Sequence, residues 1–187
     1  MSKQNKDTLE TAIFANGCFW CTEAVFQRLK GVKEVVSGFT GGKIKNPAYR
    51  EITTGRTGHA EAIKISFDSS QISYDELLEV FFATHDPTTL NRQGYDVGTQ
   101  YRSEIFYTTD VQKETAEKFI SFLEKENVFK SPIVTVISEE KPFYIAEEEH
   151  QNYYNQNKTQ RYCQFVINPK IDKLKKYYAD KLNTVIN

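Results

Sequence analysis

Two kinds of hydrophobic periodicity alternate over residues 11–107, and their order limits the possible folds more than any other feature of the sequence. Apolar residues three and four apart predict helices over 19–29 and from about 74 to 82, the second opened by a Ser73–Glu76 capping box. Alternating or β-branched runs predict strands at 11–15, 32–39, 61–67 and 102–107. The order strand, helix, strand, strand, helix, strand predicts a ferredoxin-like split β-α-β sandwich, an α+β fold with a mixed sheet and helices on one face.

The remaining segments extend this unit rather than form a second one. A further helix is predicted over 111–126 and a strand over 133–137. No repeat or linker-like stretch divides the chain, so we expect one domain over 1–187. It has a polar N-terminal extension at 1–10 and an irregular tail from about 143 to 187, with a final helix over 171–182.

Two segments without periodicity are candidate functional loops. One runs from Thr40 to His59, and the other connects Phe82 to Tyr101 with polar, glycine and aromatic residues. Loops of this length in a compact domain are usually functional or disordered. Both contain too many side chains that can pack for disorder to be expected.

Charge and hydropathy exclude two classes of partner. Lys and Arg total 24 against 25 for Asp and Glu, a formal net charge of −1, so there is no overall positive field to attract nucleic acid. No apolar run approaches the ~20 residues that span a bilayer, and Met1–Glu10 lacks the apolar core of a signal peptide. We therefore expect a cytoplasmic protein that binds neither nucleic acid nor membrane.

Three cysteines are too few for a disulfide scaffold, and an odd number favours thiol chemistry. They are Cys18, Cys21 and Cys163. Cys18 stands where a predicted strand turns into a helix, close to unpaired N–H groups and the positive end of the helix dipole. That position favours the thiolate and predicts a reactive cysteine. The alternative is a small buried hydrophobic residue.

Cys18 and Cys21 also form a C-x-x-C pair, which allows two other interpretations. A zinc site needs four ligands, and His59, His85 and His150 are not spaced to complete one, so no metal is expected. A general thiol-disulfide oxidoreductase would suit two cysteines at a helix start. The predicted strand order lacks the βαβ unit of the thioredoxin fold, so this remains the alternative function.

Five segments carry a specific resemblance, which covers about residues 11–170. In this order along the chain, they resemble the signature of the A-type peptide methionine sulfoxide reductase family. Phe39 and Cys21 stand where the family often has Tyr and Gly, and neither departure affects the expected catalytic residues. The segments are GCFWC at 17–21, GFTGG at 38–42, NPAYREITTGRTGHAE at 46–61, HDPTTLNRQGYDVGTQYRS at 85–103 and FYIAEEEHQNYY at 143–154.

The resemblance implies an enzyme of protein repair under oxidative stress, which reduces methionine S-sulfoxide, protein-bound or free, without metal or organic cofactor. Cys18 matches the family's nucleophile, which attacks the electrophilic sulfur. Glu61 matches the acid that supplies a proton to the oxygen, and burial would raise its pKa enough to keep it protonated. Tyr49 and Tyr101 match phenols that donate hydrogen bonds to the sulfoxide oxygen.

The same resemblance assigns the substrate pocket. Phe19 and Trp20 match the walls of an apolar slot for the S-methyl group, although either could be ordinary core residues. Asp96 matches a residue that orients the polar groups of the substrate and the site tyrosines, or it could be a turn residue. Glu23 and His150 are expected to support the site rather than to react.

Recycling requires a second thiol, because reduction leaves Cys18 as a sulfenic acid. Cys163 stands where a subset of the family carries its resolving cysteine, and we expect a flexible tail to deliver it. Cys21 is the alternative, although on a regular first turn its side chain would point elsewhere. The resemblance implies that thioredoxin or a similar dithiol protein reduces the disulfide, and we expect a monomer.

Two rival functions make different predictions. A general dithiol oxidoreductase using Cys18 and Cys21 would keep its activity when Glu61 is replaced. A binding module could recognise oxidised proteins through the same aromatic pocket without turnover, and would bind stoichiometrically and release no methionine.

Overall fold

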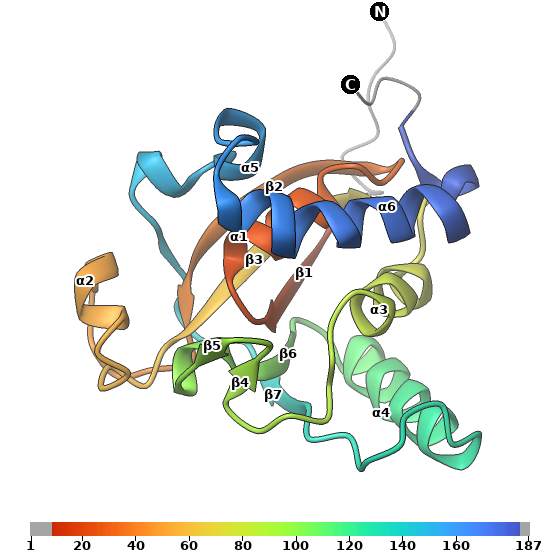
Figure 1. Ribbon diagram of the computed structural model, residues 1–187. Helices are drawn as coiled ribbons and strands as arrows, with labels where there is room; N and C mark the ends of the chain where they lie inside the picture. Colours follow the sequence, from red (N-terminus) through yellow and green to blue (C-terminus); the bar gives the residue numbers. More distant parts are fainter. Residues whose placement is uncertain (1–8, 184–187) are drawn as a thin grey trace, which may run out of the picture.

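A six-stranded mixed sheet organises the computed structural model, which describes residues 9–183 (Figure 1). Its order is β7-β6-β1-β3-β2-β8, and all neighbours are antiparallel except β6 and β7. The strands are β1 (Leu9–Asn16), β2 (Val32–Thr40), β3 (Ala60–Asp68), β6 (Ser103–Tyr107), β7 (Val136–Glu139) and β8 (Tyr144–Ile145).

The predicted split β-α-β unit forms the centre of this sheet. Helix α1 (Phe19–Phe26) connects β1 to β2, and α3 (Tyr74–Ala83) precedes β6. Ser73 caps α3 as predicted, because its side chain accepts a hydrogen bond from the Glu76 N–H. The order β6-β1-β3-β2 confirms the ferredoxin-like α+β fold.

Two element boundaries differ from the predictions. Helix α1 ends at Phe26 rather than at Leu29, and Leu29 instead forms a β-bridge with Leu182 near the end of the described chain. Strand β7 begins at Val136 rather than at Ile133, because the Val134 N–H donates to the Pro87 carbonyl, away from the sheet. In both places a contact distant in sequence replaces the local pattern.

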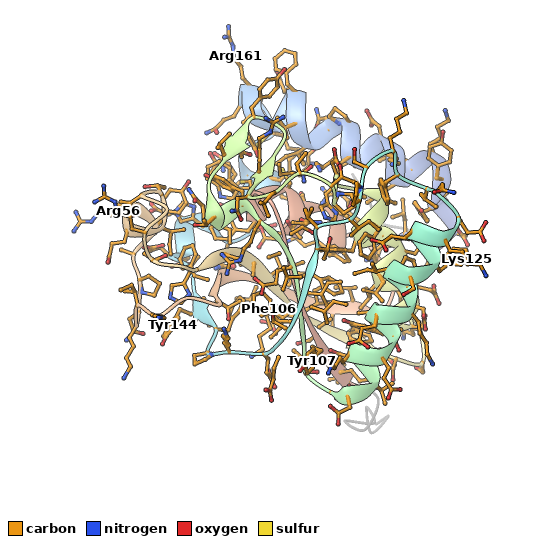
Figure 2. The ribbon with its side chains drawn as sticks, turned by 90° about the horizontal axis from the view of Figure 1, so that it is seen from below. Arg56, Phe106, Tyr107, Lys125, Tyr144 and Arg161 are labelled. Carbon is orange, nitrogen blue, oxygen red and sulfur yellow. The ribbon has the colours of Figure 1, made fainter. Side chains whose placement is uncertain are left out.

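Most of the core lies between one face of the sheet and the helices. The Phe14 ring of β1 lies 5.6 Å from the Phe26 ring of α1 and 5.0 Å from the Phe81 ring of α3, centroid to centroid. Helix α4 (Asp110–Lys125) packs against α3, β6 and β7 at one edge of the sheet (Figure 2). The other face has a smaller cluster of buried side chains, Ile13, Ala15, Ala60, Ala62 and Phe106, covered by Phe143.

The two segments without periodicity are ordered and lie against each other. The first holds the short helix α2 (Tyr49–Ile52). The second holds a hairpin of β4 (Arg92–Gln93) and β5 (Asp96–Val97), followed by the 3₁₀ turn η2 (Thr99–Tyr101). The Thr99 hydroxyl donates to the Gly55 carbonyl at 3.2 Å, which fixes the two loops together.

The tail is largely helical and returns to the core. It contains η3 (Glu148–His150), α5 (Tyr153–Gln156), a π-helical turn η4 (Cys163–Ile167), α6 (Asn168–Tyr177) and η5 (Ala179–Lys181). The final helix is confirmed, but it begins at Asn168 rather than at Ile171 and ends at Tyr177 rather than at Leu182. In this structure the tail around Cys163 is packed, because Cys163, Ile167, Ile171 and Leu174 are buried at helical spacing, and the expected movement of the tail stays a prediction. In Figure 1 this helix crosses in front of α1, which it contacts.

Between residues 9 and 183, no helix is both long and apolar enough to cross a bilayer. Within the same range, no cluster of three His, Cys, Asp or Glu side chains could hold a metal ion.

Candidate active site

Cys18 lies at the junction between β1 and α1, as the sequence predicted. Gly17 makes the turn with φ of +115°, and a Cβ atom there would come within 2.8 Å of the Gln93 side chain. Cys18 is the N-cap residue of α1, and only 8% of it is exposed. The thiol therefore lies at the start of the helix and is almost fully shielded from solvent.

The expectation that this position favours the thiolate is wrong for the free protein. Burial raises the pKa of the Cys18 thiol well above its usual value, and a hydrogen bond with Cys21 and the nearby Glu61 carboxyl act in the same direction. Loss of hydration is the largest of these effects, and the resting nucleophile is a thiol.

Glu61 projects from β3 toward the start of α1. Its Oε1 accepts a hydrogen bond of 3.2 Å from the Phe19 N–H, and the residue is 1% exposed. Its Oε2 is also buried and has no hydrogen-bond partner within residues 9–183. Burial raises the pKa of Glu61 to about 8, so the carboxyl is protonated at neutral pH and has a proton to donate.

Tyr49 and Tyr101 reach the same place from the two loops. Tyr49 begins α2, where its N–H donates to Glu147 Oε1 at 2.9 Å, and Tyr101 ends the η2 turn. Burial raises the pKa of both phenols, and the neighbouring Glu61 and Cys18 add to the effect. Both side chains therefore stay protonated and can serve as hydrogen-bond donors.

Phe19 and Trp20 form part of an aromatic cluster. The Phe19 ring is fully buried and stacks 6.3 Å from Tyr49, centroid to centroid. Trp20 is half-buried, its ring stacks on Tyr153 at 3.8 Å, and its Nε1 donates to His150 Nδ1 at 3.2 Å. The predicted pocket walls are thus brought together, and His150 supports Trp20 directly.

Cys21 does not point away from Cys18. The two thiols are hydrogen-bonded to each other, which corrects the expectation from an ideal first helical turn. Cys21 Sγ also lies 3.5 Å from the Tyr162 hydroxyl, and that hydroxyl donates to Asp96 Oδ2 at 2.7 Å. Cys163 follows Tyr162 in the chain and is fully buried; all three cysteines are free.

Sequence reasoning missed Tyr153, Tyr162 and Lys170. Tyr153 covers one face of Trp20, and its N–H donates to Glu23 Oε1 at 3.2 Å, which gives Glu23 its supporting role. Tyr162 connects Asp96 to Cys21, and its only signal in the sequence is that it precedes Cys163. Lys170 gives no signal, because a lysine on a helix is normally exposed.

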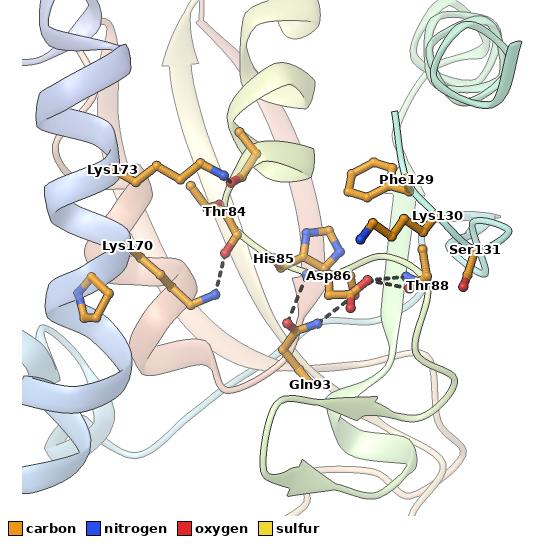
Figure 3. Close-up of a pocket in the computed structure, with 12 residues that line it drawn as sticks. Thr84, His85, Asp86, Thr88, Gln93, Phe129, Lys130, Ser131, Lys170 and Lys173 are labelled. Carbon is orange, nitrogen blue, oxygen red and sulfur yellow. Dashed lines mark hydrogen bonds between the residues drawn. The ribbon is translucent and has the colours of Figure 1, made fainter. Parts of the chain in front are cut away.

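A cavity of about 620 Å³ lies between α6 and the end of α3, and no cysteine lines it (Figure 3). Lys170 and Lys173 of α6 donate to the carbonyls of Thr84 and Ala83, which end α3. His85 stands in its wall, and burial lowers the pKa of its ring to about 3. The lysines therefore cap a helix, and the reactive groups lie elsewhere.

A buried cysteine at a helix start, a protonated carboxyl and two phenols are thus gathered beside an aromatic cluster. Residues 10–182 match the family described as peptide methionine sulfoxide reductase. The chain belongs to this family. It is a peptide-methionine (S)-S-oxide reductase, an oxidoreductase that uses a thiol to reduce methionine sulfoxide. The family favours this function over the general dithiol oxidoreductase.

Relatives in sequence and structure agree. Peptide methionine sulfoxide reductase MsrA of Deinococcus radiodurans is 59% identical over 173 residues, 92% of this chain and 84% of that protein. Reduced Mxr1 of Saccharomyces cerevisiae has a TM-score of 0.74 at 33% identity, with 87% of this chain and 95% of Mxr1 covered. The structure of Mxr1 in complex with Trx2 has a TM-score of 0.52 at 26% identity, with 82% of this chain and 90% of that chain covered.

Proposed function

We propose that Cys18 is the nucleophile and Glu61 the acid of the reductive step. The Cys18 sulfur attacks the sulfoxide sulfur while Glu61 gives its proton to the oxygen. The oxygen passes to Cys18, the thiol proton replaces the one that Glu61 donated, and methionine leaves. The observation that carries this assignment is the buried Glu61, which holds a proton at neutral pH and has one oxygen without a partner within residues 9–183.

The other predicted residues have positioning roles in the same proposal. Tyr49 and Tyr101 donate hydrogen bonds to the oxygen as its charge develops. Phe19 and Trp20 hold the S-methyl group, and this fit selects one epimer of the sulfoxide. Asp96 acts on the site through Tyr162, to which it is hydrogen-bonded.

Recycling completes the proposed cycle. The Cys18 sulfenic acid is converted to a Cys18–Cys163 disulfide, which thioredoxin or a similar dithiol protein reduces. The complex of the yeast relative with Trx2 supports this partner. We further propose a single monomeric domain that acts in the cytoplasm on free and protein-bound methionine sulfoxide, because a cycle that returns to free thiols suits a reducing compartment.

Turnover of the two separated sulfoxide epimers with dithiothreitol tests the reductive half. We expect methionine from the S epimer alone, and comparable rates with both epimers would contradict the proposed pocket. Cys163→Ser tests recycling, because the proposal makes the Cys18–Cys163 disulfide the form that thioredoxin reduces, and thioredoxin reduces sulfenic acids poorly. This variant should release about one methionine per enzyme and then stop with thioredoxin. Normal thioredoxin-driven turnover would remove Cys163 from the cycle.

A further inference from the structure

Four side chains from three parts of the chain form one hydrogen-bonded row. The free thiols of Cys18 and Cys21 share a hydrogen bond at the start of α1, and Cys21 Sγ lies 3.5 Å from the Tyr162 hydroxyl. Tyr162 in turn is 2.7 Å from Asp96 Oδ2 on β5. Both cysteines are buried and the other two residues are half-buried, so the row runs from the nucleophile toward the surface.

The donors in this row point one way. Tyr162 has a single proton and its short bond to Asp96 uses it, so the phenol oxygen accepts from the Cys21 thiol. Cys21 sulfur can then accept from Cys18. Burial raises the pKa of Tyr162, so its hydroxyl stays protonated and can pass a proton on. A proton leaving Cys21 therefore has a continuous path to the Asp96 carboxylate.

The surroundings of Cys21 also favour its thiolate. In the reduced enzyme the hydrogen bond from Cys18 lowers the pKa of Cys21 and burial opposes this, whereas the positive charge of Lys170, which also lowers the pKa, remains when Cys18 is oxidised. Lys170 stands in the wall of the cavity between α6 and the end of α3, where its ammonium donates to the Thr84 carbonyl (Figure 3). The groups that face Cys21 are thus two thiols, Tyr162, Lys170 and, beyond Tyr162, Asp96.

We propose that Tyr162 and Asp96 form a proton relay that makes Cys21 the first thiol to attack oxidised Cys18. Tyr162 passes the proton on and Asp96 is its final acceptor. This inference rests on the proposed function, because it needs a sulfenic acid on Cys18.

The step balances without an external reagent. The Cys21 sulfur forms an S–S bond to Cys18, and the S–O bond of the sulfenic acid breaks. The Cys21 proton moves to the Tyr162 oxygen as the Tyr162 proton moves to Asp96. Hydroxide leaves with the proton of Glu61 and becomes water, and exchange through solvent returns the proton on Asp96 to Glu61.

A Cys18–Cys21 disulfide formed through the relay can be converted to the proposed Cys18–Cys163 disulfide. Cys163 can then attack Cys18 in the Cys18–Cys21 disulfide, with Cys21 leaving as a thiolate that takes up the proton lost by Cys163. A thiol of lower pKa leaves faster, which favours Cys21 as the leaving group in this exchange. Cys163 directly follows Tyr162, so movement that brings Cys163 toward Cys18 displaces the relay after it has acted.

Tyr162→Phe tests the relay because it removes the hydroxyl and keeps the ring. In a single turnover with methionine sulfoxide, methionine release and the decay of the sulfenic acid, trapped with dimedone, are measured separately. We expect the ratio of decay to release to fall by about 10²-fold, the usual scale for a positioned proton acceptor. Decay in the variant should also rise with pH, since Cys21 must then ionise into water. Asp96→Asn, which can accept a hydrogen bond but no proton, should lower the same ratio.

Tyr154→Phe is the matched control, because its hydroxyl is on the same segment and bonds to Asn168 rather than to a thiol. It should leave the ratio unchanged. Peptide mapping of Cys163→Ser after one turnover should show Cys18 joined to Cys21. An unchanged ratio in Tyr162→Phe and Asp96→Asn, or rapid sulfenic acid decay in Cys21→Ser, would overturn the relay. Failure of the proposed function gives a different result, since no methionine would form at all.

Discussion

The residues of the reductive step and those of recycling are held in different ways. Cys18 and Glu61 come from the ends of β1 and β3, neighbouring strands at the centre of the sheet, and the Phe19 N–H bonds directly to Glu61. Tyr162 and Cys163 come from the tail, where a π-helical turn leads into α6 and packs on the outside of α1. The first group is fixed at the ends of two central strands, and the second lies in a tail that packs against α1.

This difference matches the demands of the two half-reactions. Proton donation requires a donor held firmly at hydrogen-bond distance, about 2.7–3.1 Å, from the developing charge, which neighbouring strands provide. Disulfide exchange requires a sulfur to travel to its target, and Cys163 begins a π-helical turn, a rare form that is frequent at functional sites. We infer that substitutions in the sheet region affect the rate of methionine formation, whereas those in the tail affect the return of Cys18 to its thiol form.

The largest effect expected in the sheet region comes from Cys18→Ser. A hydroxyl with a far higher pKa offers almost no nucleophile at neutral pH, so methionine formation should be abolished. The measurement is methionine released in a single turnover, with Cys21→Ser as the matched cysteine replacement. Residual activity in Cys18→Ser above a few per cent would assign the nucleophile to another group.

Glu61→Gln should lower the rate of methionine formation by about 10²-fold, because the amide cannot donate the proton that the oxygen needs. The pH dependence gives a second test. Glu61 has a pKa of about 8 and acts as the acid, so the wild-type rate should fall as the pH rises through 8. Single turnovers across this range should show that the fall is lost in Glu61→Gln. A variant with the wild-type pH profile would place the acid elsewhere.

Tyr49→Phe and Tyr101→Phe should each slow methionine formation by about 10-fold, less than the ~10²- to 10³-fold usual for losing one such donor, because the other phenol substitutes in part. If both phenols act on one oxygen, the double variant should depart from the product of the two single effects. The measurement is a double-mutant cycle on the single-turnover rate. Independent multiplicative losses would mean that the two residues act at separate places. Tyr107→Phe, on the distant end of β6, is the control.

The smallest effect should come from the tail, with His150→Phe. This change keeps a ring beside Trp20 and Tyr49 but removes the acceptor for the Trp20 N–H. A typical hydrogen bond contributes ~0.5–1.5 kcal/mol, so we expect a ~2- to 13-fold rise in KM with little change in kcat. Steady-state kinetics with dithiothreitol measures both. A fall in kcat alone would place His150 in the chemical step.

The sequence was most informative where local pattern and contact agree. The strands and helices of the split β-α-β unit follow their periodicities, and Cys18 lies at the predicted helix start. The expected charge state of Cys18 was wrong, because burial depends on residues distant in the chain that no local pattern shows.

The contacts of Cys21 also could not be predicted from the sequence. An ideal helical turn separates Cys21 from Cys18, yet the real first turn starts from an extended N-cap residue, Cys18 with φ of −63° and ψ of 126°. Tyr162 and Lys170 approach Cys21 only because the tail packs back on α1. Such long-range packing decides which residues of a tail share a site with a helix at the other end of the chain.

Trp20 is the only tryptophan in the chain, and its indole contacts residues that we assign to both half-reactions. One face stacks on Tyr153, its N–H bonds to His150, and the Tyr162 ring meets it edge-on at 5.8 Å. Light absorbed at the red edge of the aromatic band therefore excites a single reporter inside the site. The protein carries its own optical probe, whose emission can time substrate entry and tail rearrangement in the unlabelled wild type.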